Sequence, residues 1–499
     1  MHQLTRLFSN HDHEGEEMRT ESAERVFRSY ETVAKEADQD LEVVEGKIPR
    51  DLRGVHYRNG SGRMERGGVW YGHPFDGDGM VSRFAYTEKG IHYRNRFVRT
   101  HWYLEEEKAG RILYRNFGTN IPGGVLKNLF RVRFKNAANT SVICHGGKLL
   151  ALWEGGPPHL LDPETLATLG TYDFDGVLID PDPLMRSLRG RELPFSAHPK
   201  VDPSSGVLYN FGMVLGLKPE LKIYRVQKNG QMEPSIHVKL DALGFLHDFA
   251  WTPNWRLFLF GPLTFDVPRM LLGLKPPMAC AQFASSRATQ VILVPRNGSQ
   301  PVWLHTSPGF VFHFCNAFED GTDRIIADGL WYERFPEVAR FEDLPRIGFG
   351  DFPRMMPTRF VLDLKNRTVK AEQISDVPGE LPRIHPEYVG RPYRFFWCSA
   401  TSSNWSGPYL SGVTKVDTET RTTVFRDFAP GLTSEPMFVP RPDSVREDDG
   451  WLLVTVYRSD EHRSDLLVLE AADLSTVCRA RLPHHESPGF HGTWVPAGV

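Results

Sequence analysis

The sequence has no long apolar run. Nowhere do about 18 apolar residues follow one another, the length that a membrane-spanning helix needs. It also lacks a Cys-x-x-Cys motif, and its five cysteines are widely separated and odd in number. A structural zinc site or a disulfide framework is therefore not expected. A formal charge of −3 gives no reason to expect a nucleic-acid partner. These absences favour a soluble protein of a reducing cytoplasm.

The N-terminal segment lacks the apolar core and the small-residue cleavage site of a secretory signal. Residues 1–40 are polar and charged, and they predict a tail followed by a short helix around Glu21–Ala37. From Val43 onward the sequence consists of short apolar runs separated by turn residues. We therefore expect one folded domain over residues 41–499.

Long amphipathic helical patterns are also missing from that domain, which instead consists of short apolar runs separated by turn residues. Its runs are rich in Val, Ile, Leu, Tyr and Phe and are interrupted by Gly, Pro, Asn and Asp at intervals of roughly 8–12 residues, the pattern of an all-β protein. Five strand pairs are predicted: Lys148–Trp153 with His159–Thr165, Gly206–Phe211 with Lys222–Val226, Arg359–Leu364 with Thr368–Gln373, Gly412–Asp417 with Thr422–Phe425, and Gly450–Tyr457 with Asp465–Leu469. The repetition has no strict period. So many hairpins in one domain favour a β-propeller over a sandwich.

Most of the 19 histidines need no special role. His2, His11 and His13 lie in the predicted tail, and His484-His485 is expected to be an exposed pair. Four others stand in apolar or aromatic settings beside a residue that would fix the backbone: His198, His247, His313 and His491. Their spacings of 49, 66 and 178 residues match no short metal motif. From spacing alone, core histidines and a metal site on a propeller axis both remain open.

Several ordered motifs resemble the carotenoid cleavage oxygenase family, and within it the cyanobacterial apocarotenoid oxygenase group. The resemblance extends over about residues 43–494. It rests on Leu52–Gly60, His73–Val81, Ala151–Gly156, Ser196–Lys200, His247–Ala250, Phe312–Glu319, Ser434–Pro440 and Phe490–Trp494, and for the cyanobacterial group on Phe97–Thr100, Lys135–Thr140 and Glu447–Leu453. One departure is Ser61, where the family usually has proline.

The resemblance implies a seven-bladed propeller with a helical and loop cap over the face that carries the metal. One iron(II) per subunit would be bound on the axis by His198, His247, His313 and His491, with dioxygen as co-substrate. Four neutral imidazoles would leave coordination positions open for dioxygen. His305 competes with His313 for the third place, but it lacks the Phe-His-x-x-Asn-Ala-Phe-Glu context.

The family also implies residues around the ligands. Glu154, Glu380 and Glu435 would orient His247, His313 and His491 respectively, because a metal-bound imidazole needs an acceptor for its other nitrogen. Thr140 matches the threonine whose methyl group crowds one iron position. Four aromatic residues would line an apolar substrate tunnel, and core packing is the alternative for each: Phe117, Trp153, Phe245 and Phe312.

The expected activity is cleavage of a carbon–carbon double bond of an apocarotenoid, at the 15,15′ position, to give retinal-type aldehydes. Three alternatives remain: cleavage of full-length carotenoids at another bond, cleavage of stilbenes, and a non-catalytic propeller that binds a lipid or a protein. Stilbene-cleaving relatives hold a phenol with a tyrosine and a lysine, a pair that Tyr103 and Lys135 could imitate.

Three segments that mix leucine with arginine or lysine interrupt the strand pattern: Asn120–Phe134, Asp182–Arg191 and Val267–Pro277. The neutral interpretation is that their apolar residues cover the core. A lipid-soluble substrate instead favours a peripheral membrane contact. Ile121–Phe134 is the candidate patch.

Overall fold

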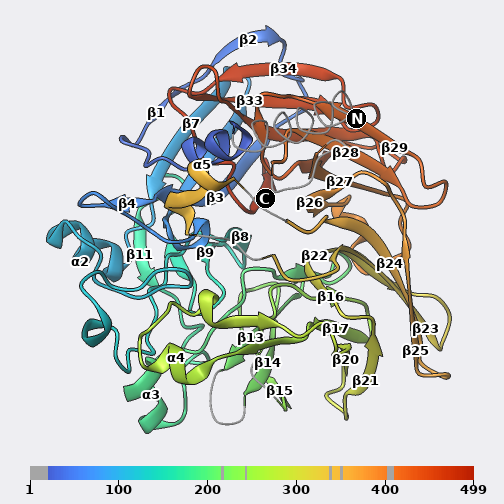
Figure 1. Cartoon of the computed structure of the whole chain (residues 1–499). Helices are drawn as coiled ribbons and strands as arrows, with labels where there is room; N and C mark the ends of the chain where they lie inside the picture. Colours follow the sequence, from blue (N-terminus) through green and yellow to red (C-terminus); the bar gives the residue numbers. More distant parts are fainter. Residues whose placement is uncertain are drawn as a thin grey trace, which may run out of the picture.

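Seven antiparallel sheets are arranged in a ring in the computed structural model (Figure 1). The structure describes residues 21–214, 219–241, 244–336, 340–348, 352–401 and 409–498. The tail histidines His2, His11 and His13 lie outside the described residues. The predicted seven-bladed propeller is confirmed.

Each blade is a four- to six-stranded sheet whose first strand lies nearest the axis. From the axis outward the blades are as follows: blade 1, β35 (Gly492–Pro496), β3 (Gly54–Arg63), β6 (Asp78–Thr87), β7 (Gly90–Phe97) and β1 (Asp38–Asp40); blade 2, β8 (Ser141–His145), β9 (Lys148–Leu152), β10 (His159–Leu161) and β11 (Thr168–Thr171); blade 3, β12 (Lys200–Val201), β13 (Leu208–Val214), β14 (Glu220–Val226) and β15 (Ile236–Lys239); blade 4, β16 (Ala250–Trp251), β17 (Trp255–Phe260), β20 (Thr289–Pro295) and β21 (Val302–Thr306); blade 5, β22 (Phe310–Glu319), β23 (Arg324–Tyr332), β24 (Met356–Asp363) and β25 (Thr368–Gln373); blade 6, β26 (Gly379–Arg383), β27 (Phe395–Ala400), β28 (Gly412–Asp417) and β29 (Thr423–Asp427); blade 7, β30 (Leu432–Thr433) and β31 (Met437–Pro440), then β32 (Gly450–Arg458), β33 (Arg463–Glu470), β34 (Thr476–Arg481) and β2 (Glu42–Gly46).

Both ends of the described chain close the ring. The late strand β35 pairs with β3, so blade 1 joins the two ends of the chain. The early strand β2 pairs with β34, so blade 7 does the same. The innermost strands of neighbouring blades contact one another, including β35 with β8 and β16 with β22. Residues far apart in sequence therefore meet on the axis.

All five predicted strand pairs are hydrogen-bonded neighbours in the structure. The recurring turn after many strands is built around an aspartate whose side chain accepts hydrogen bonds from the backbone two or three residues later. Asp162 accepts from Glu164 and Thr165, and Asp417 accepts from Glu419 and Thr420. The Asp-containing turns identified in the sequence are thus side-chain-stabilised connections.

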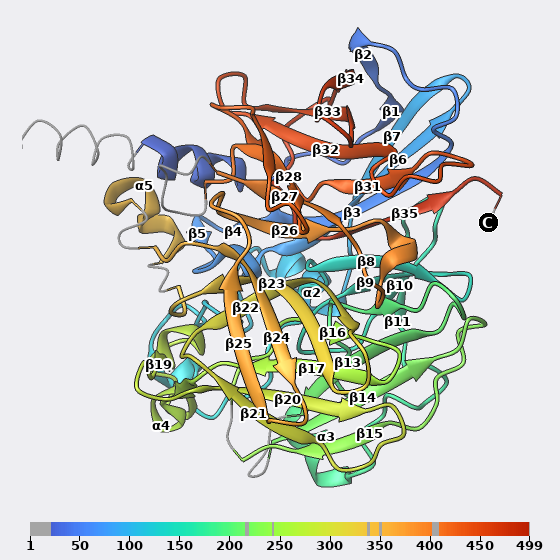
Figure 2. The same ribbon diagram turned by 90° about the vertical axis from the view of Figure 1, so that its right-hand side faces the viewer.

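Five α-helices are present in the described part of the chain: residues 21–29, α2 (His101–Ala109), α3 (Pro183–Arg189), α4 (Val267–Leu271) and α5 (Leu344–Ile347). The short hairpins β4–β5 (Glu65–Arg66 with Val69–Trp70) and β18–β19 (Leu263–Phe265 with Ala281–Phe283) accompany them. α4, α5 and the helix at 21–29 lie on one side of the ring, as the predicted cap requires (Figure 2). None of these helices has the length and apolar character to cross a bilayer.

The N-terminal helix ends earlier than predicted. It ends at residue 29, whereas the sequence pattern suggested a helix to Ala37. Ala23 and Val26 pack in a core cluster with Phe341 of the cap, and the chain then continues to β1, which pairs with β7. Residues 21–40 therefore lie against the propeller. The boundary between a tail and a domain at residue 40 stays a prediction.

The core contains several buried histidines. For one of them, His485, the predicted exposure is wrong. His485 is buried and not exposed as predicted, because its ring stacks on His462 at 4.2 Å and its Nε2 lies 2.9 Å from the Glu31 carbonyl. Burial lowers the pKa of His485 and of His159 to about 4, and the pKa of His56 and of His73 to about 3. All four rings are neutral at pH 7.

Because these four histidines are buried and neutral, we expect the free energy of unfolding to decrease in acid. Their folded pKa values lie below the unfolded value near 6.5, so the unfolded chain binds more protons and the free energy of unfolding falls as the pH decreases from about 6.5 to 4. Asp76 opposes the effect, since burial raises its pKa to about 7. Urea midpoints of metal-free protein should decrease between pH 7.5 and pH 4.5. A constant or rising midpoint would contradict this expectation.

Candidate metal centre

The four histidines singled out in the sequence lie together on the propeller axis. His198 lies two residues before β12, His247 precedes β16, His313 lies within β22, and His491 directly precedes β35. They therefore come from the inner edges of blades 3, 4, 5 and 1. All four are buried, and one nitrogen of each lies within 4.8 Å of the others.

The Nε2 atoms are the atoms that converge. His198 Nε2 lies 2.9 Å from His247 Nε2, His247 Nε2 lies 3.2 Å from His313 Nε2, and His313 Nε2 lies 3.0 Å from His491 Nε2. Nitrogens held about 2.1 Å from one metal ion at right angles would be about 3.0 Å apart. The spacing thus fits neighbouring positions around a single ion.

Carboxylates are hydrogen-bonded to the opposite nitrogen of two rings. His491 Nδ1 lies 2.7 Å from Glu435 Oε1, and His313 Nδ1 is hydrogen-bonded to Glu380 Oε2. A proton on Nδ1 leaves the Nε2 lone pair free, so unprotonated nitrogens face one another at the centre. Lone pairs at this spacing repel unless a cation lies between them. The arrangement therefore fits a divalent metal ion.

The rings of His198 and His313 have different electrostatic environments. In the metal-free protein, burial followed by repulsion from the other three rings lowers the pKa of His198 well below its usual range. Burial also acts to lower the pKa of His313, but the Glu380 carboxylate outweighs it and raises that pKa. Glu380 thus places negative charge next to the cluster, which favours a cation there.

The three glutamates differ in how firmly they are held. Glu435 is buried, and its Oε2 accepts from Gly492 N at 2.9 Å and from Arg383 at 2.8 Å. Glu380 accepts from the Tyr332 hydroxyl at 2.7 Å. Burial acts to raise the pKa of Glu435, but Arg383 and His491 hold it well below its usual range. Glu435 is therefore an anion at every ordinary pH.

Glu154 approaches the cluster more loosely. Its Oε1 lies 3.0 Å from His247 Nδ1 and 3.7 Å from His198 Nε2, and its side chain is 22% exposed. The atoms Glu154 Oε1 and His247 Nδ1 are misaligned for a hydrogen bond, so the contact is an ion-pair distance without bond geometry. Blade 2 supplies Glu154, blade 6 Glu380 and blade 7 Glu435, so all seven blades contribute to the centre.

Local backbone features place two of the ligand candidates. β22 has an extra residue between Val311 and Phe314, a bulge that re-aims His313. Before β35, Asn59 binds the backbone of Phe490 and His491, and His491 N donates to the Thr140 carbonyl at 3.1 Å. The segment before β35 is thus fixed by blades 1 and 2.

Two further sequence expectations can be located. A Cβ added to Gly492 would lie 2.3 Å from the Tyr57 carbonyl oxygen, so this position needs glycine for space. His305 lies on β21, the outermost strand of blade 4, far along the sheet from the axial β16. This position is consistent with the choice of His313, and not His305, as the third ligand candidate.

Aromatic rings surround one side of the cluster. Phe312 lies 5.4 Å from the His247 ring and Phe245 stacks on it at 6.1 Å, while Phe117 lies 5.7 Å from Phe245. Phe310 and Phe335 extend the same cluster. The Trp153 backbone forms an isolated bridge with Phe195, and the Trp153 ring lies next to Gly155 and Gly156. The structure thus gathers three of the four expected tunnel residues beside His247; their role in binding substrate stays a prediction.

A cavity of about 700 Å³ reaches His198, His313 and His491 from another direction. Its wall includes ion pairs, Lys200 with Asp248 and Arg383 with Glu435, as well as Pro496 at the end of β35. β35 extends away from α4 and α5 (Figure 2). This cavity therefore approaches the cluster from the side of the ring away from the cap, and none of the four expected tunnel residues lines it.

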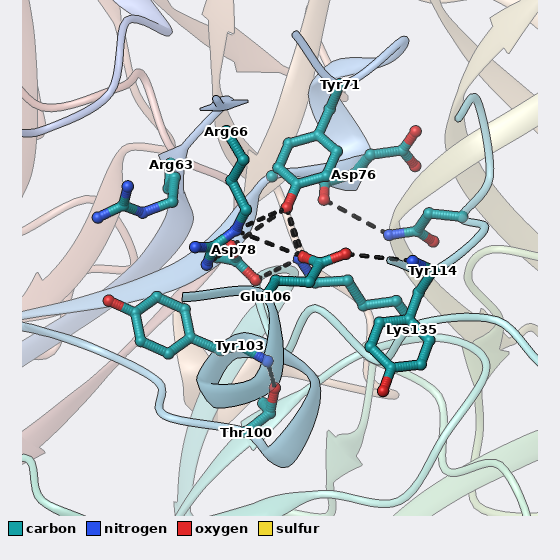
Figure 3. Close-up of polar contacts among 12 residues, drawn as sticks. Arg63, Arg66, Tyr71, Asp76, Asp78, Thr100, Tyr103, Glu106, Tyr114 and Lys135 are labelled. Atoms are coloured by element: carbon teal, nitrogen blue, oxygen red, sulfur yellow. Dashed lines mark hydrogen bonds and ion pairs between the residues drawn. The ribbon is translucent and has the colours of Figure 1, made fainter. Parts of the chain in front are cut away.

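Lys135 lies in a buried ionic cluster between α2 and blade 1 (Figure 3). Its ammonium lies 2.5 Å from Asp78, 2.7 Å from Glu106 and 2.8 Å from the Tyr71 hydroxyl. Its three donor positions therefore all face protein acceptors. The Tyr103 ring packs on the Phe97 ring at 5.4 Å. Neither Tyr103 nor Lys135 is therefore arranged around an open site for a phenol.

Sequence reasoning missed residues that contact the glutamates. Tyr332 and Arg383 hold Glu380 and Glu435, and each is separated from its partner by about fifty residues. Nothing in their local sequence marks them, because the contact exists only between blades. Asp248 adjoins His247 in the sequence, and its side chain also bonds to Lys200 in blade 3 and to Phe314 N in blade 5.

The comparisons with known proteins agree with this geometry. The model of the family described as retinal pigment epithelial membrane protein matches residues 30–496. The chain is 39% identical to apocarotenoid-15,15′-oxygenase of Synechocystis, covering 96% of this chain and 97% of that protein. It is 30% identical to isoeugenol monooxygenase of Pseudomonas nitroreducens, covering 92% and 94%, and 29% identical to resveratrol cleavage oxygenase 1 of Aspergillus fumigatus, covering 96% and 97%. A crystal structure of cobalt-substituted Synechocystis apocarotenoid oxygenase matches with a TM-score of 0.89 at 38% identity, covering 95% of this chain and 99% of that one.

Proposed function

Because the chain belongs to the family of the retinal pigment epithelial membrane protein and the carotenoid cleavage oxygenases, we propose that it is an iron(II) dioxygenase that cleaves an apocarotenoid. The bond proposed is the central 15,15′ double bond, and the products are two carbonyl compounds, one of them a retinal-type aldehyde. Both atoms of dioxygen enter the products, so no external reductant is required. The convergence of four Nε2 atoms at about 3 Å carries the proposal.

His198, His247, His313 and His491 would hold the metal. An imidazole donor set suits iron as well as several other first-row metals, so the choice of iron rests on the family. Bound iron(II) supplies the electrons that activate dioxygen toward the double bond. Glu380 and Glu435 keep the Nδ1 protons of their histidines in place, so that the Nε2 lone pairs stay directed at the axis.

The aromatic residues beside His247 would position the substrate. A polyene is flat and apolar, and a site lined by rings binds such a molecule by shape and by exclusion of water. Phe117, Phe245 and Phe312 form this wall. The ring of His247 stacks on Phe245, so a polyene seated against these rings would lie next to the centre.

The stilbene-cleaving alternative is less well supported. A lysine that binds a phenol needs a donor free for the ligand, whereas the Lys135 ammonium has Tyr71, Glu106 and Asp78 around it. A buried cation with these partners would lose them on turning toward a substrate, which costs several kcal/mol. Two alternatives remain: cleavage of full-length carotenoids at another bond, and a non-catalytic propeller, which predicts no stoichiometric metal.

One experiment separates these functions. Purified protein loaded with iron(II) is incubated under air with an apocarotenal, β-carotene or resveratrol, and products are identified by mass spectrometry. The proposal expects two carbonyl products from the apocarotenal and little turnover of the other two. Intact apocarotenals together with no bound iron would overturn it, and preferred cleavage of resveratrol would establish the phenol-cleaving alternative.

The three leucine- and arginine-rich segments support a peripheral membrane contact. The segments at 120–134 and 266–277 pack together: Phe130 N donates to the Leu271 carbonyl, and buried Arg115 donates to the carbonyls of Arg131 and Met270. Their tips expose large apolar side chains, with Leu126 88% and Phe130 66% exposed. Met278 N donates to the Phe117 carbonyl, so this surface adjoins the aromatic cluster.

We define the apolar patch as Val125, Leu126, Phe130, Leu272 and Leu274. Lys127, Arg131 and Lys275 lie in the same two segments. Apolar tips with flanking cations are typical of surfaces that enter the interface of a bilayer. The protein would thus stay cytoplasmic and bind a membrane peripherally, where its substrate dissolves.

Replacement of Leu126, Phe130 and Leu272 by serine is expected to weaken binding to phosphatidylcholine–phosphatidylglycerol vesicles by roughly tenfold or more, because three apolar side chains lose their transfer from water. Co-sedimentation measures the effect. The matched control is Leu169→Ser, since Leu169 is 62% exposed on β11, outside the patch. Equal vesicle binding by the triple variant and the control would discard the patch.

A further inference from the structure

Asp248 lies beside His247 in the blade 4 segment, and its side chain reaches blades 3 and 5, which carry His198 and His313. Its Oδ1 lies 2.8 Å from Lys200 Nζ, close in sequence to His198 in blade 3. Its Oδ1 also accepts from Phe249 N at 2.7 Å, next to the blade 4 ligand candidate, and its Oδ2 accepts from Phe314 N at 2.9 Å, next to His313 in blade 5. The side chain is 1% exposed.

Such a bond matters because the sheets do not connect the blades to one another. The strand ladders around the centre pair strands within one blade, from the innermost outward. The separation of His247 and His313 therefore depends on contacts that span the gap between their blades. His247 Nε2 and His313 Nε2 lie 3.2 Å apart, and the carboxylate that joins their backbones is that of Asp248.

Glu435 has the same pattern of partners on the other side of the centre. It binds an arginine of blade 6, a backbone N–H of blade 1 and the ring of His491. Asp248 binds a lysine of blade 3 and backbone N–H groups of the blade 4 segment and of blade 5. Each is a buried anion with one cation and at least one N–H donor, the condition under which a buried charge is tolerated.

We propose that Asp248 is a positioning residue that sets the spacing of His247 and His313 for the metal, although it touches no part of the metal shell itself. This inference rests on the proposed metal site. The hydrogen bond from Phe314 N joins the blade 4 segment to blade 5 and sets the spacing, the bond from Phe249 N fixes the carboxylate within its own segment, and Lys200 neutralises the carboxylate. Variants can separate the two contributions.

Asp248→Asn keeps the size of the side chain but replaces one acceptor oxygen by an amide, so one of the N–H donors at Phe249 and Phe314 loses its partner. Asp248→Ala removes both bonds. Lys200→Met removes the cation and leaves both backbone bonds intact. If the spacing is what matters, the two Asp248 variants should impair metal binding and Lys200→Met should not.

The readout is Co(II) titration of the metal-free protein, followed by the visible absorption bands of the bound ion, which report ligand geometry. We expect Asp248→Asn and Asp248→Ala to weaken Co(II) affinity by roughly 10- to 100-fold, as for other residues that orient ligands, and to shift the bands. Lys200→Met should retain the wild-type affinity and spectrum. Urea midpoints of the metal-free variants show separately how much of any change is general stability.

Wild-type Co(II) affinity and bands in both Asp248 variants would overturn the inference while the metal site itself stands. An equal loss in Lys200→Met would overturn it as well, because charge and not backbone spacing would then be responsible. Absence of Co(II) binding by the wild-type protein would instead refute the proposed metal site. If Asp248→Ala fails to fold, Asp248→Asn, which is nearly isosteric, carries the test.

Discussion

A chain that ends at Gly489 should bind no metal and cleave no substrate. The deletion removes His491 and the whole of β35, which pairs with β3 from Gly54 to Arg58. The affinity for Co(II) or iron(II) should fall by more than the roughly 100-fold that loss of a ligand-orienting group costs. Metal analysis after dialysis measures this, and the strands of blades 2 to 6 should keep the circular dichroism of a β protein.

Two further chains distinguish loss of the ligand from loss of the strand. Full-length His491→Ala keeps β35 and should lose metal to a similar extent. A chain that ends at Pro496 keeps both His491 and β35, and it should bind metal as the intact protein does. Stoichiometric metal in the chain that ends at Gly489 would show that His491 is not a ligand.

Replacement of the three glutamates by glutamine should impair metal binding unequally, in the order of how firmly each is held. Glu380→Gln and Glu435→Gln should weaken metal affinity by roughly 10- to 100-fold, because a glutamine can accept through only one of its two terminal atoms. Each of these carboxylates accepts bonds through both oxygens. The Glu154 side chain is 22% exposed and misaligned with His247, so Glu154→Gln should lose less than about tenfold.

Titration with Co(II) and turnover of an apocarotenal would both follow this order if the proposed function is right. Glu372→Gln is the surface control, since Glu372 lies on β25 at the outer edge of blade 5 and pairs with Arg421. A larger effect of Glu154→Gln than of Glu380→Gln would contradict the ranking. It would also show that the hydrogen-bond geometry around His247 changes when the metal is bound.

The strand pairs could be predicted because each depends on a local pattern. A run such as Gly412–Asp417, an aspartate turn and a return strand specify a hairpin without help from the rest of the chain. The end of the N-terminal helix was less predictable. The sequence pattern predicted a helix to Ala37, but the chain leaves the helix at residue 29 to reach β1. Tertiary pairing there overrides the local preference.

The candidate centre was only partly accessible from the sequence. The apolar settings of His247 and His313 marked them as unusual, but their spacing did not require a common metal, and the motifs of a family were needed to group them. Contacts between blades left no local signal. Tyr332, Arg383 and the bonds of Asp248 illustrate this, since each pair of partners meets only when the ring is closed.

Closure of the ring around one centre has a consequence for how such a chain can evolve. Propellers can grow or shrink by duplication and loss of blades when the blades are interchangeable. Here the blades are not interchangeable, because blades 1, 3, 4 and 5 each present a histidine to the axis and blades 2, 6 and 7 each present a glutamate. A copied or deleted blade would misplace every ligand after it. Selection therefore acts on each blade separately. For this reason a strict repeat period is not expected in the sequence of the chain.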